Sequence, residues 1–234
     1  MRRSLSNIFG TIRRLLGRTS SPSSDVALSN QQSMTKTFST IYQTNAWLNA
    51  ESRSGPGSTV ARCQPVIRAL TELIDEFAVK SLLDAPCGDF NWMKEAPMPD
   101  TAYIGVDVVP EMIDRNQRLY GSARREFRCL DIARGPLPRV DMIFCRDCLV
   151  HLCHADVLKA LAAFKRSGSR FLVATTFSNR TSNEDITTGE WRPLNLEKAP
   201  FHLPAPLRLV SDGCPVPGYT DKALGVWPLE QLPG

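Results

Sequence analysis

The sequence of 234 residues lacks two features, and each absence excludes a class of protein. No apolar run reaches the roughly 18 to 20 residues that a membrane-spanning helix needs, so we expect a soluble protein. No GxGxxG sequence is present, which argues against a dinucleotide-binding site. The 7 cysteines are odd in number and several stand inside predicted strands, so free thiols in the cytoplasm are a better interpretation than a disulfide framework.

One group of soft ligands has the short spacing of a zinc site: Cys145, Cys148, His151, Cys153 and His154. No second ligand pair occurs at the spacing of a zinc ribbon, and Cys145 stands where a buried strand should end. We therefore predict no metal.

Positive charge is concentrated at the beginning of the chain. Five arginines precede the first acidic residue, Asp25, and they are Arg2, Arg3, Arg13, Arg14 and Arg18. Subtracting them from the net charge of +4 leaves −1, so the rest of the protein is near neutral. The pI of 8.7 is then no argument for nucleic-acid binding, and we predict no nucleic-acid partner.

Residues 1–18 carry apolar side chains at helical spacing with the arginines mostly off that stripe, which predicts a basic amphipathic helix. Such a helix could dock on a membrane surface or a partner protein; it could equally pack on its own domain, fray, or act as an organelle presequence. A stretch rich in Ser, Pro, Gln and Asn follows and predicts a mobile linker. We therefore divide the chain into residues 1–36, a helix with a linker, and one domain over residues 37–234.

Seven short apolar segments predict the strands of a sheet. They are residues 81–85, 102–107, 126–130, 140–145, 171–176, 207–210 and 223–227. Helices are expected to begin with Pro65 in a first turn, to run from 110 to 121, and to run from about 155 to 166. This alternation predicts a single α/β domain, a doubly wound and mostly parallel seven-stranded sheet with helices on both faces.

Ahead of the first predicted helix, Tyr42 and Trp47 are expected to anchor a segment to the core. The irregular loop of residues 54–58 follows. It could close over a cofactor, with Arg53 reaching a carboxylate, or it could pack on the surface.

Polar residues follow four successive predicted strands. The first strand ends at Asp84 and the second at Asp107, close to the spacing of about 20 residues at which an acid meets the hydroxyl pair of a ribose. Asp131 follows the third strand, and Arg146 and Asp147 follow the fourth. Ligands of such sheets bind beyond the carboxyl ends of the strands, so we expect these side chains to line one pocket.

The stretch SLLDAPCGDFNWM, residues 81–93, resembles motif I of the class I S-adenosylmethionine-dependent methyltransferases. RDCLVHL, residues 146–152, resembles the segment after the fourth strand in the same superfamily. The resemblance covers about residues 81–177, and the last strands match more loosely. It implies the Rossmann-like fold of that superfamily, S-adenosylmethionine as cofactor, and methyl transfer as the activity.

The cofactor site that the resemblance implies follows the strand ends. Asp107 would accept hydrogen bonds from the ribose hydroxyls, Asp131 would read the adenine amino group, and Asp84 would organise the loop around the methionine part. The other residues that the resemblance places at the cofactor are Ala85, Pro86, Gly88, Asp89, Val108, Ile132, Cys145 and Arg146.

The sequence departs from the common pattern of three glycines in motif I. Pro86 and Phe90 take the outer positions and only Gly88 remains. Proline removes an N–H donor and fixes φ, so we expect a loop of different shape. No Asn-Pro-Pro-Tyr-type motif follows the fourth strand, so the resemblance disfavours methylation of a nucleobase amino group.

Methyl transfer to a hydroxyl requires a base that takes its proton. Asp147 and His151 are four residues apart, and a helical turn would put both above the reacting methyl group. We predict His151 as the general base, with Asp147 as its orienting partner or as a substrate ligand. The alternative is a His151 that merely begins a helix with a satisfied ring.

A long polar stretch, about residues 178–206, follows the cofactor-binding core of about residues 60–177 and predicts a lid or specificity loop. Its Trp191 could stack on a sugar or another ring, or could simply pin the loop. The sequence thus predicts methyl transfer to an oxygen of a polar small molecule or glycan. The rival is a non-catalytic cofactor-binding or scaffold protein that docks to a membrane or partner through residues 1–18. The oligomeric state stays open.

Overall fold

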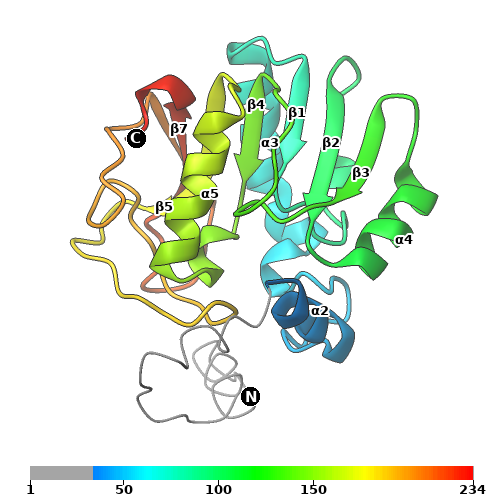
Figure 1. The fold of residues 1–234 in the computed structure, drawn as a ribbon, viewed down its shortest axis with the longest axis horizontal. Helices are drawn as coiled ribbons and strands as arrows, with labels where there is room; N and C mark the ends of the chain where they lie inside the picture. The colour runs from blue at the N-terminus through cyan, green and yellow to red at the C-terminus, as the bar shows by residue number, and fades with distance from the viewer. Residues whose placement is uncertain (1–33, 234) are drawn as a thin grey trace.

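The computed structural model describes residues 34–233, so the helix predicted over residues 1–18 and nearly all of the predicted linker lie outside the described residues. The described residues form a 7-stranded sheet with the strand order β3-β2-β1-β4-β5-β7-β6 (Figure 1). The strands are β1 (Ser81–Asp84), β2 (Ala102–Asp107), β3 (Arg125–Cys129), β4 (Met142–Cys145), β5 (Phe171–Phe177), β6 (Arg208–Ser211) and β7 (Lys222–Pro228).

Neighbouring strands from β3 through β5 are parallel, whereas β7 is antiparallel to both of its neighbours, β5 and β6. The chain leaves β1 toward β2 on one side and returns to β4 on the other, which makes the gap beyond β1 and β4 the switch point of the sheet. The predicted α/β fold and all seven predicted strands are confirmed. The antiparallel β7 brings its first residue to the edge where the parallel strands end.

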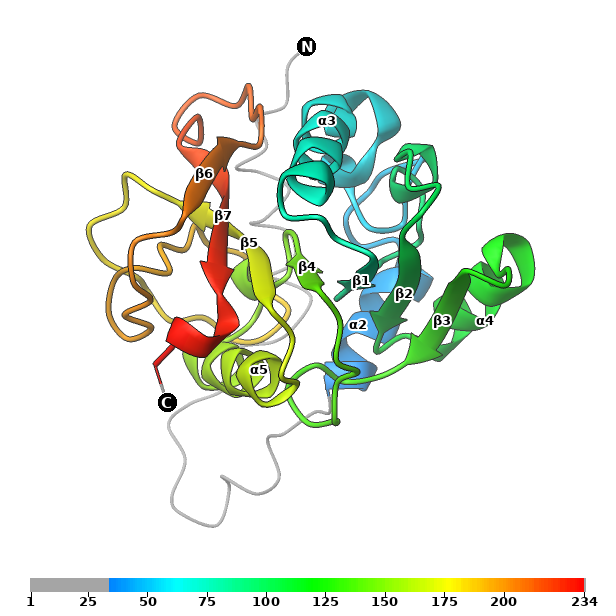
Figure 2. The ribbon, with the colours of Figure 1, turned by 90° about the horizontal axis from the view of Figure 1, so that it is seen from above.

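The central strands β1, β4 and β5 are buried on both faces, which explains their apolar runs, whereas β3 and β6 are largely exposed. Successive residues alternate between two core clusters: Leu82 and Phe144 belong to one, and Leu83 and Ile143 to the other. Figure 2 shows α3 (Val60–Glu76) and α5 (His154–Arg166) on opposite sides of the sheet. The remaining helices are α2 (Met34–Thr44), α4 (Pro110–Tyr120) and the short 3₁₀ turns η1 (Pro56–Ser58), η2 (Met93–Glu95), η3 (Leu149–His151) and η4 (Leu229–Gln231).

The position predicted for Pro65 is wrong, because α3 begins one turn earlier and Pro65 lies inside it. The true beginning is stabilised from outside the helix, where the Val60 backbone N–H donates to the Glu51 carboxylate over 2.7 Å. A carboxylate at a helix N-terminus satisfies an otherwise unpaired donor and favours the helix dipole. This partner lies in the preceding loop, so local sequence signals did not reveal it.

Helix α2 spans Met34–Thr44, so its first residues fall within residues 1–36, which the sequence assigned to the helix and linker. Its Ile41 is buried, and Phe38 and Tyr42 pack against the core, as expected for Tyr42. Figure 1 shows α2 beyond the carboxyl ends of β1 and β2. Within residues 34–233, no helix has the length and apolar character needed to cross a membrane.

Candidate functional site

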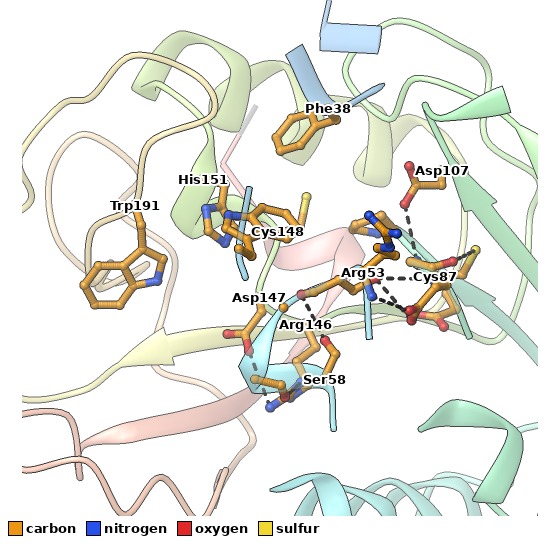
Figure 3. A pocket seen from close by; sticks show the side chains of 18 of the residues that line it. Phe38, Arg53, Ser58, Cys87, Asp107, Arg146, Asp147, Cys148, His151 and Trp191 are labelled. Carbon is orange, nitrogen blue, oxygen red and sulfur yellow. Dashed lines mark hydrogen bonds and ion pairs between the residues drawn. The ribbon is translucent and has the colours of Figure 1, made fainter. Parts of the chain in front are cut away.

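A cavity of about 450 Å³ opens at the carboxyl ends of β1, β2 and β4, and it is covered by α2 and by residues 53–58 (Figure 3). This volume is typical of small-molecule sites. Most of the predicted site residues line it, namely Asp84, Pro86, Gly88, Asp89, Asp107, Val108, Ile132, Arg146, Asp147 and His151. The predicted Ala85, Asp131 and Cys145 are not among the lining residues.

Asp84, the last residue of β1, is 3% exposed and accepts a hydrogen bond of 2.6 Å from the Tyr103 hydroxyl. Burial raises the pKa of Asp84 from 3.8 to about 8. The carboxyl group is therefore mostly protonated at neutral pH. Tyr103 is its one hydrogen-bond partner within the described chain, so the predicted role in organising the neighbouring loop stays a prediction.

The loop after β1 is held by residues from the next strand and helix. The Gly88 N–H donates to the Asp107 carboxylate over 3.3 Å, and the Asn116 side-chain amide donates to the Gly88 carbonyl over 2.8 Å. Gly88 has φ +55, and a Cβ there would collide with the Ser54 hydroxyl oxygen. A larger residue would require the Ser54 hydroxyl to move, and the positive φ favours glycine at this position.

Phe90, which replaces an expected glycine, turns away from the cavity into the core. Its ring lies 5.2 Å from the ring of Tyr103 and 5.0 Å from that of Phe127, both edge-on. The side chain is 1% exposed and belongs to the core cluster of α3. The substitution therefore leaves the cavity open.

Asp89 ties the covering loop to this site. Its carboxylate accepts hydrogen bonds from the Ser52 hydroxyl (3.0 Å), the Arg53 N–H (2.7 Å) and the Ser54 hydroxyl (3.3 Å). Arg53 and the loop of residues 54–58 line the cavity, so the interpretation as a loop over the site is favoured over surface packing.

Asp107, the last residue of β2, points its carboxylate at the loop of Gly88 (Figure 3). It also accepts a hydrogen bond of 3.1 Å from the Val109 N–H. Burial raises the pKa of Asp107 to about 6, and the backbone donors oppose the shift. The group is thus largely ionised at pH 7 and can accept further hydrogen bonds from a ligand.

Asp131, which was predicted to contact the adenine amino group, is not among the residues that line the cavity. Its carboxylate accepts a hydrogen bond from the Ala133 N–H at 2.8 Å and pairs with Arg134 at 3.5 Å. The cavity is instead lined here by the apolar side chains of Leu130 and Ile132. They could sandwich a flat ring, whereas reading of an amino group by Asp131 stays a prediction.

Four charged groups form a buried network at the carboxyl edge of the sheet, contributed by the ends of β4 and β6 and the first residue of β7. Arg146 pairs with Asp212 at 2.9 Å, and Lys222 pairs with Asp147 at 2.6 Å and with Asp212 at 3.3 Å. Arg146 also lies 3.4 Å from Asp147. Burial alone would raise the pKa of Asp147, but the two cations hold it well below its ordinary value. The two positive and two negative charges make the network neutral.

Asp212 and Lys222 were missed in the sequence. Lys222 begins β7 and lies at the carboxyl edge because β7 is antiparallel, whereas Asp212 lies there because it follows β6, which runs in the same direction as β5. In the sequence, Lys222 directly precedes an apolar strand segment and Asp212 follows the strand before it. That Lys222 lies in the site could be predicted only by knowing that the seventh strand is antiparallel.

His151 ends the turn η3 and lines the cavity (Figure 3). Its Nδ1 lies 2.8 Å from the Glu190 carbonyl. Burial lowers its pKa below 6.5. The neutral ring therefore donates from Nδ1, and Nε2 has no hydrogen-bond partner within residues 34–233. Asp147 does not orient this ring through a hydrogen bond, so that version of its predicted role lacks support; its carboxylate is held by Lys222 and Arg146 instead.

Aromatic rings line the side of the cavity away from Asp107. Trp191 is half-buried, with its ring edge-on to Tyr219 at 5.0 Å and to Phe177 at 6.1 Å. Trp47 of the covering segment lies 5.2 Å from the His151 ring. Trp191 both packs on its neighbours and lines the cavity, so the two interpretations of it are compatible.

The arrangement has two halves. One half offers an acid, a glycine loop and apolar side chains suited to a nucleoside-like ligand, which are Asp107, Gly88, Val108, Leu130 and Ile132. The other half offers a free imidazole nitrogen, a carboxylate and aromatic rings. In the part of the chain that the structure describes, no three His, Cys, Asp or Glu side chains are grouped to hold a metal ion.

Comparison with known families gives a match over residues 82–168, and the family is described as a methyltransferase domain. The matched segment contains Gly88, Asp107, Leu130 and Ile132 of the first half of the cavity, and both Asp147 and His151 of the second. A search of curated protein sequences gives no significant match.

Solved structures share the fold. The 1,6-didemethyltoxoflavin-N1-methyltransferase of Burkholderia thailandensis aligns with TM-score 0.58 at 14% identity, over 90% of this chain and 91% of that one. Human N-acetylserotonin methyltransferase aligns with TM-score 0.55 at 11% identity, over 94% of this chain and 65% of the human one. The [4+2]-cyclase SpnF aligns with TM-score 0.56 at 16% identity, over 80% of this chain and 77% of that one. At these identities the likeness establishes the fold.

Proposed function

We propose, from the premise that this chain carries a class I S-adenosylmethionine-dependent methyltransferase domain, that it transfers a methyl group to a hydroxyl oxygen of a polar small molecule or glycan. The observation that carries the oxygen assignment is the free Nε2 of a neutral, oriented His151 at the cavity wall.

The cofactor half of the cavity fits S-adenosylmethionine. Asp107 is ionised near pH 7 and can accept from a ribose hydroxyl pair, and the Gly88 loop leaves room beside it. Leu130 and Ile132 supply apolar contacts for an adenine. When bound, the cofactor supplies a methyl group on a sulfonium that carries its own leaving group. The protein then needs to align the acceptor, exclude water and accept one proton.

His151 is proposed to accept that proton. Because Nδ1 donates to the Glu190 carbonyl, Nε2 presents its lone pair to the acceptor. The lowered pKa keeps the ring neutral at pH 7, as a base requires before the reaction. Asp147 is proposed as a ligand of the acceptor, the second of its two predicted roles.

The charge network argues for a neutral acceptor. Arg146 and Lys222 are matched by Asp147 and Asp212, so neither of these two cations is left unpaired for a phosphate or carboxylate. A hydroxyl group, which both donates and accepts, suits the neighbouring Asp147 carboxylate and Lys222 ammonium. Trp191 adds a ring that could stack on a sugar face.

The test combines cofactor binding with transfer of a tritiated methyl group to fractionated metabolites and glycans. We expect binding of S-adenosylmethionine and S-adenosylhomocysteine, and a labelled product whose methyl group is on oxygen. His151→Gln and Asp147→Asn should each lower turnover by about 10²-fold or more, with nearly unchanged S-adenosylhomocysteine affinity. Wild-type rates in both variants would refute the assigned roles.

The second candidate is a cofactor-binding protein that transfers no methyl group, docking to a membrane or partner as a scaffold or catalysing another reaction. It is favoured by one observation, that a [4+2]-cyclase has the same fold. Calorimetry and the transfer assay separate the two. Tight cofactor binding without any labelled product in any fraction would support the second candidate, and no binding at high micromolar cofactor would exclude both.

A further inference from the structure

The backbone carbonyl groups of the turn that carries His151 receive hydrogen bonds from one distant segment. A short 3₁₀ turn leaves its carbonyl groups without partners in a following helical turn. Here the four carbonyls of residues 149–152 each accept a hydrogen bond from residues 189–192. His151 receives the Gly189 N–H at 2.8 Å, and Val150 receives the Arg192 N–H at 3.1 Å.

The Arg192 guanidinium supplies the other two bonds. Its Nη1 donates to the Leu149 carbonyl at 2.8 Å and its Nη2 to the Leu152 carbonyl at 2.7 Å, so the planar group spans both sides of His151. Its Nε donates to the Glu184 carbonyl at 3.1 Å.

Arg192 is 4% exposed, yet its guanidinium makes no ion pair within the described residues. Burying a cation without a counter-charge is costly. Only the rigid fork of an arginine meets two carbonyls in this way, whereas a lysine offers one point charge. The burial is therefore explained by the turn that the arginine holds.

The same segment sets the ring of His151, because the Glu190 carbonyl contacts Nδ1. The segment is itself fixed to the beginning of α5. The Asp185 carboxylate accepts from the His154 N–H at 2.7 Å, and the Thr188 hydroxyl donates to Asp156 at 2.9 Å. These contacts favour a fixed support here over a mobile lid.

We infer that Arg192 is a positioning residue, which holds the turn of residues 149–152 so that His151 donates from Nδ1 to the Glu190 carbonyl and presents Nε2 to the cavity. The inference rests on the proposed function in taking His151 as the base. Its geometric content, the tautomer and its dependence on Arg192, is measurable without any acceptor.

The experiment is long-range ¹H–¹⁵N NMR of the full chain labelled with ¹⁵N-histidine. The chain has 3 histidines, so His154→Gln and His202→Gln identify the His151 signals. In the wild type we expect protonated Nδ1 and unprotonated Nε2 at pH 7.5. In Arg192→Met the Nε2–H tautomer should become a major form, since free imidazole favours it, and Arg192→Lys should lie between the two.

Arg180→Met is the matched control, because Arg180 lies in the same stretch but binds the Gly218 carbonyl and Asp221. It should leave the His151 tautomer unchanged. A wild-type tautomer in folded Arg192→Met would overturn the inference. If that variant does not fold, an unchanged tautomer in Arg192→Lys has the same meaning. Failure of methyl transfer leaves the tautomer unaffected, so the two proposals fail separately.

Discussion

Burial raises the pKa of each carboxyl group at the strand ends, and the hydrogen-bond and ion-pair partners decide whether the net pKa rises or falls. Asp84 has a tyrosine hydroxyl as its hydrogen-bond partner, and desolvation raises its pKa to about 8. Asp107 has backbone donors, and its pKa rises only to about 6. Asp147 has two cations, which outweigh desolvation and lower its pKa. Position at a strand end alone therefore does not fix the charge that a ligand would meet.

The raised pKa of Asp84 makes a prediction about stability. The folded state binds a proton that the unfolded state releases between pH 3.8 and about 8, so stability falls as pH rises through this range. In Asp84→Asn the amide oxygen can still accept from Tyr103 but has no proton to lose. Between pH 6.5 and pH 8, the free energy of unfolding of the variant should rise relative to that of the wild type by about 1 kcal/mol per pH unit.

Urea unfolding of the ligand-free proteins at pH 6.5, 7.2 and 8.0 measures this difference. The window avoids the lower pKa values of Asp107 and His151. Parallel pH profiles for the two proteins would show that Asp84 does not titrate there.

At the scale of elements, the site depends on segments that are remote in sequence. The segment of residues 52–54 is joined to the loop after β1 through Asp89 and lies over the cavity. The stretch after β5 supports the His151 turn through Arg192. In both cases a polar side chain, Asp89 or Arg192, joins two segments that no helix or strand connects.

Asp89→Ala tests the first connection. The change leaves the donors of Ser52, Arg53 and Ser54 without their acceptor, which should cost about 1 to 3 kcal/mol of stability. The covering loop should loosen, so calorimetry should show S-adenosylhomocysteine affinity reduced by about tenfold or more, equivalent to about 1.4 kcal/mol.

Asp141→Ala is the matched control for this prediction. Asp141 accepts a comparable set of hydrogen bonds from Lys80, Ser81 and Arg170. It directly precedes β4, at the amino ends of the strands and away from the cavity at their carboxyl ends. It should lose stability and keep its affinity. Equal effects of both variants on affinity would mean that Asp89 acts only through general stability.

At the scale of the whole molecule, two core clusters cover the two faces of one sheet, and the polar residues gather at one edge. The net positive charge of the sequence comes from residues 1–18, whose five arginines face no acidic residue before Asp25. Because the rest of the chain is near neutral, any attraction to an anionic surface should depend on this segment.

We propose that residues 1–18 bind anionic membranes, and removing them tests this. The full chain should co-sediment with vesicles that contain anionic lipid, less so at high salt, and the shortened chain should stay in the supernatant. Vesicles of neutral lipid are the control. The proposal fails if anionic vesicles retain neither form, and partner docking or packing on the domain would then be the better interpretation.

The sequence by itself determined the fold and most of the cofactor half of the site. Seven short segments located all the strands, and polar residues after the first four marked the edge of the sheet where ligands bind, beyond the carboxyl ends of parallel strands. Asp84, Gly88, Asp107 and Ile132 could be placed in this way. These patterns involve residues that are close in sequence, so they can be identified without knowing which distant segments come into contact.

The tertiary structure decided the half of the cavity around His151 and Asp147. Lys222 reaches Asp147 because β7 runs antiparallel, Asp212 reaches Arg146 from the end of β6, and Glu190 rather than Asp147 orients His151. Asp131 turned to Ala133 and Arg134, and Phe90 turned into the core. Each outcome depends on a hydrogen bond or contact between segments that only folding brings together, and side-chain direction at a strand end follows those partners.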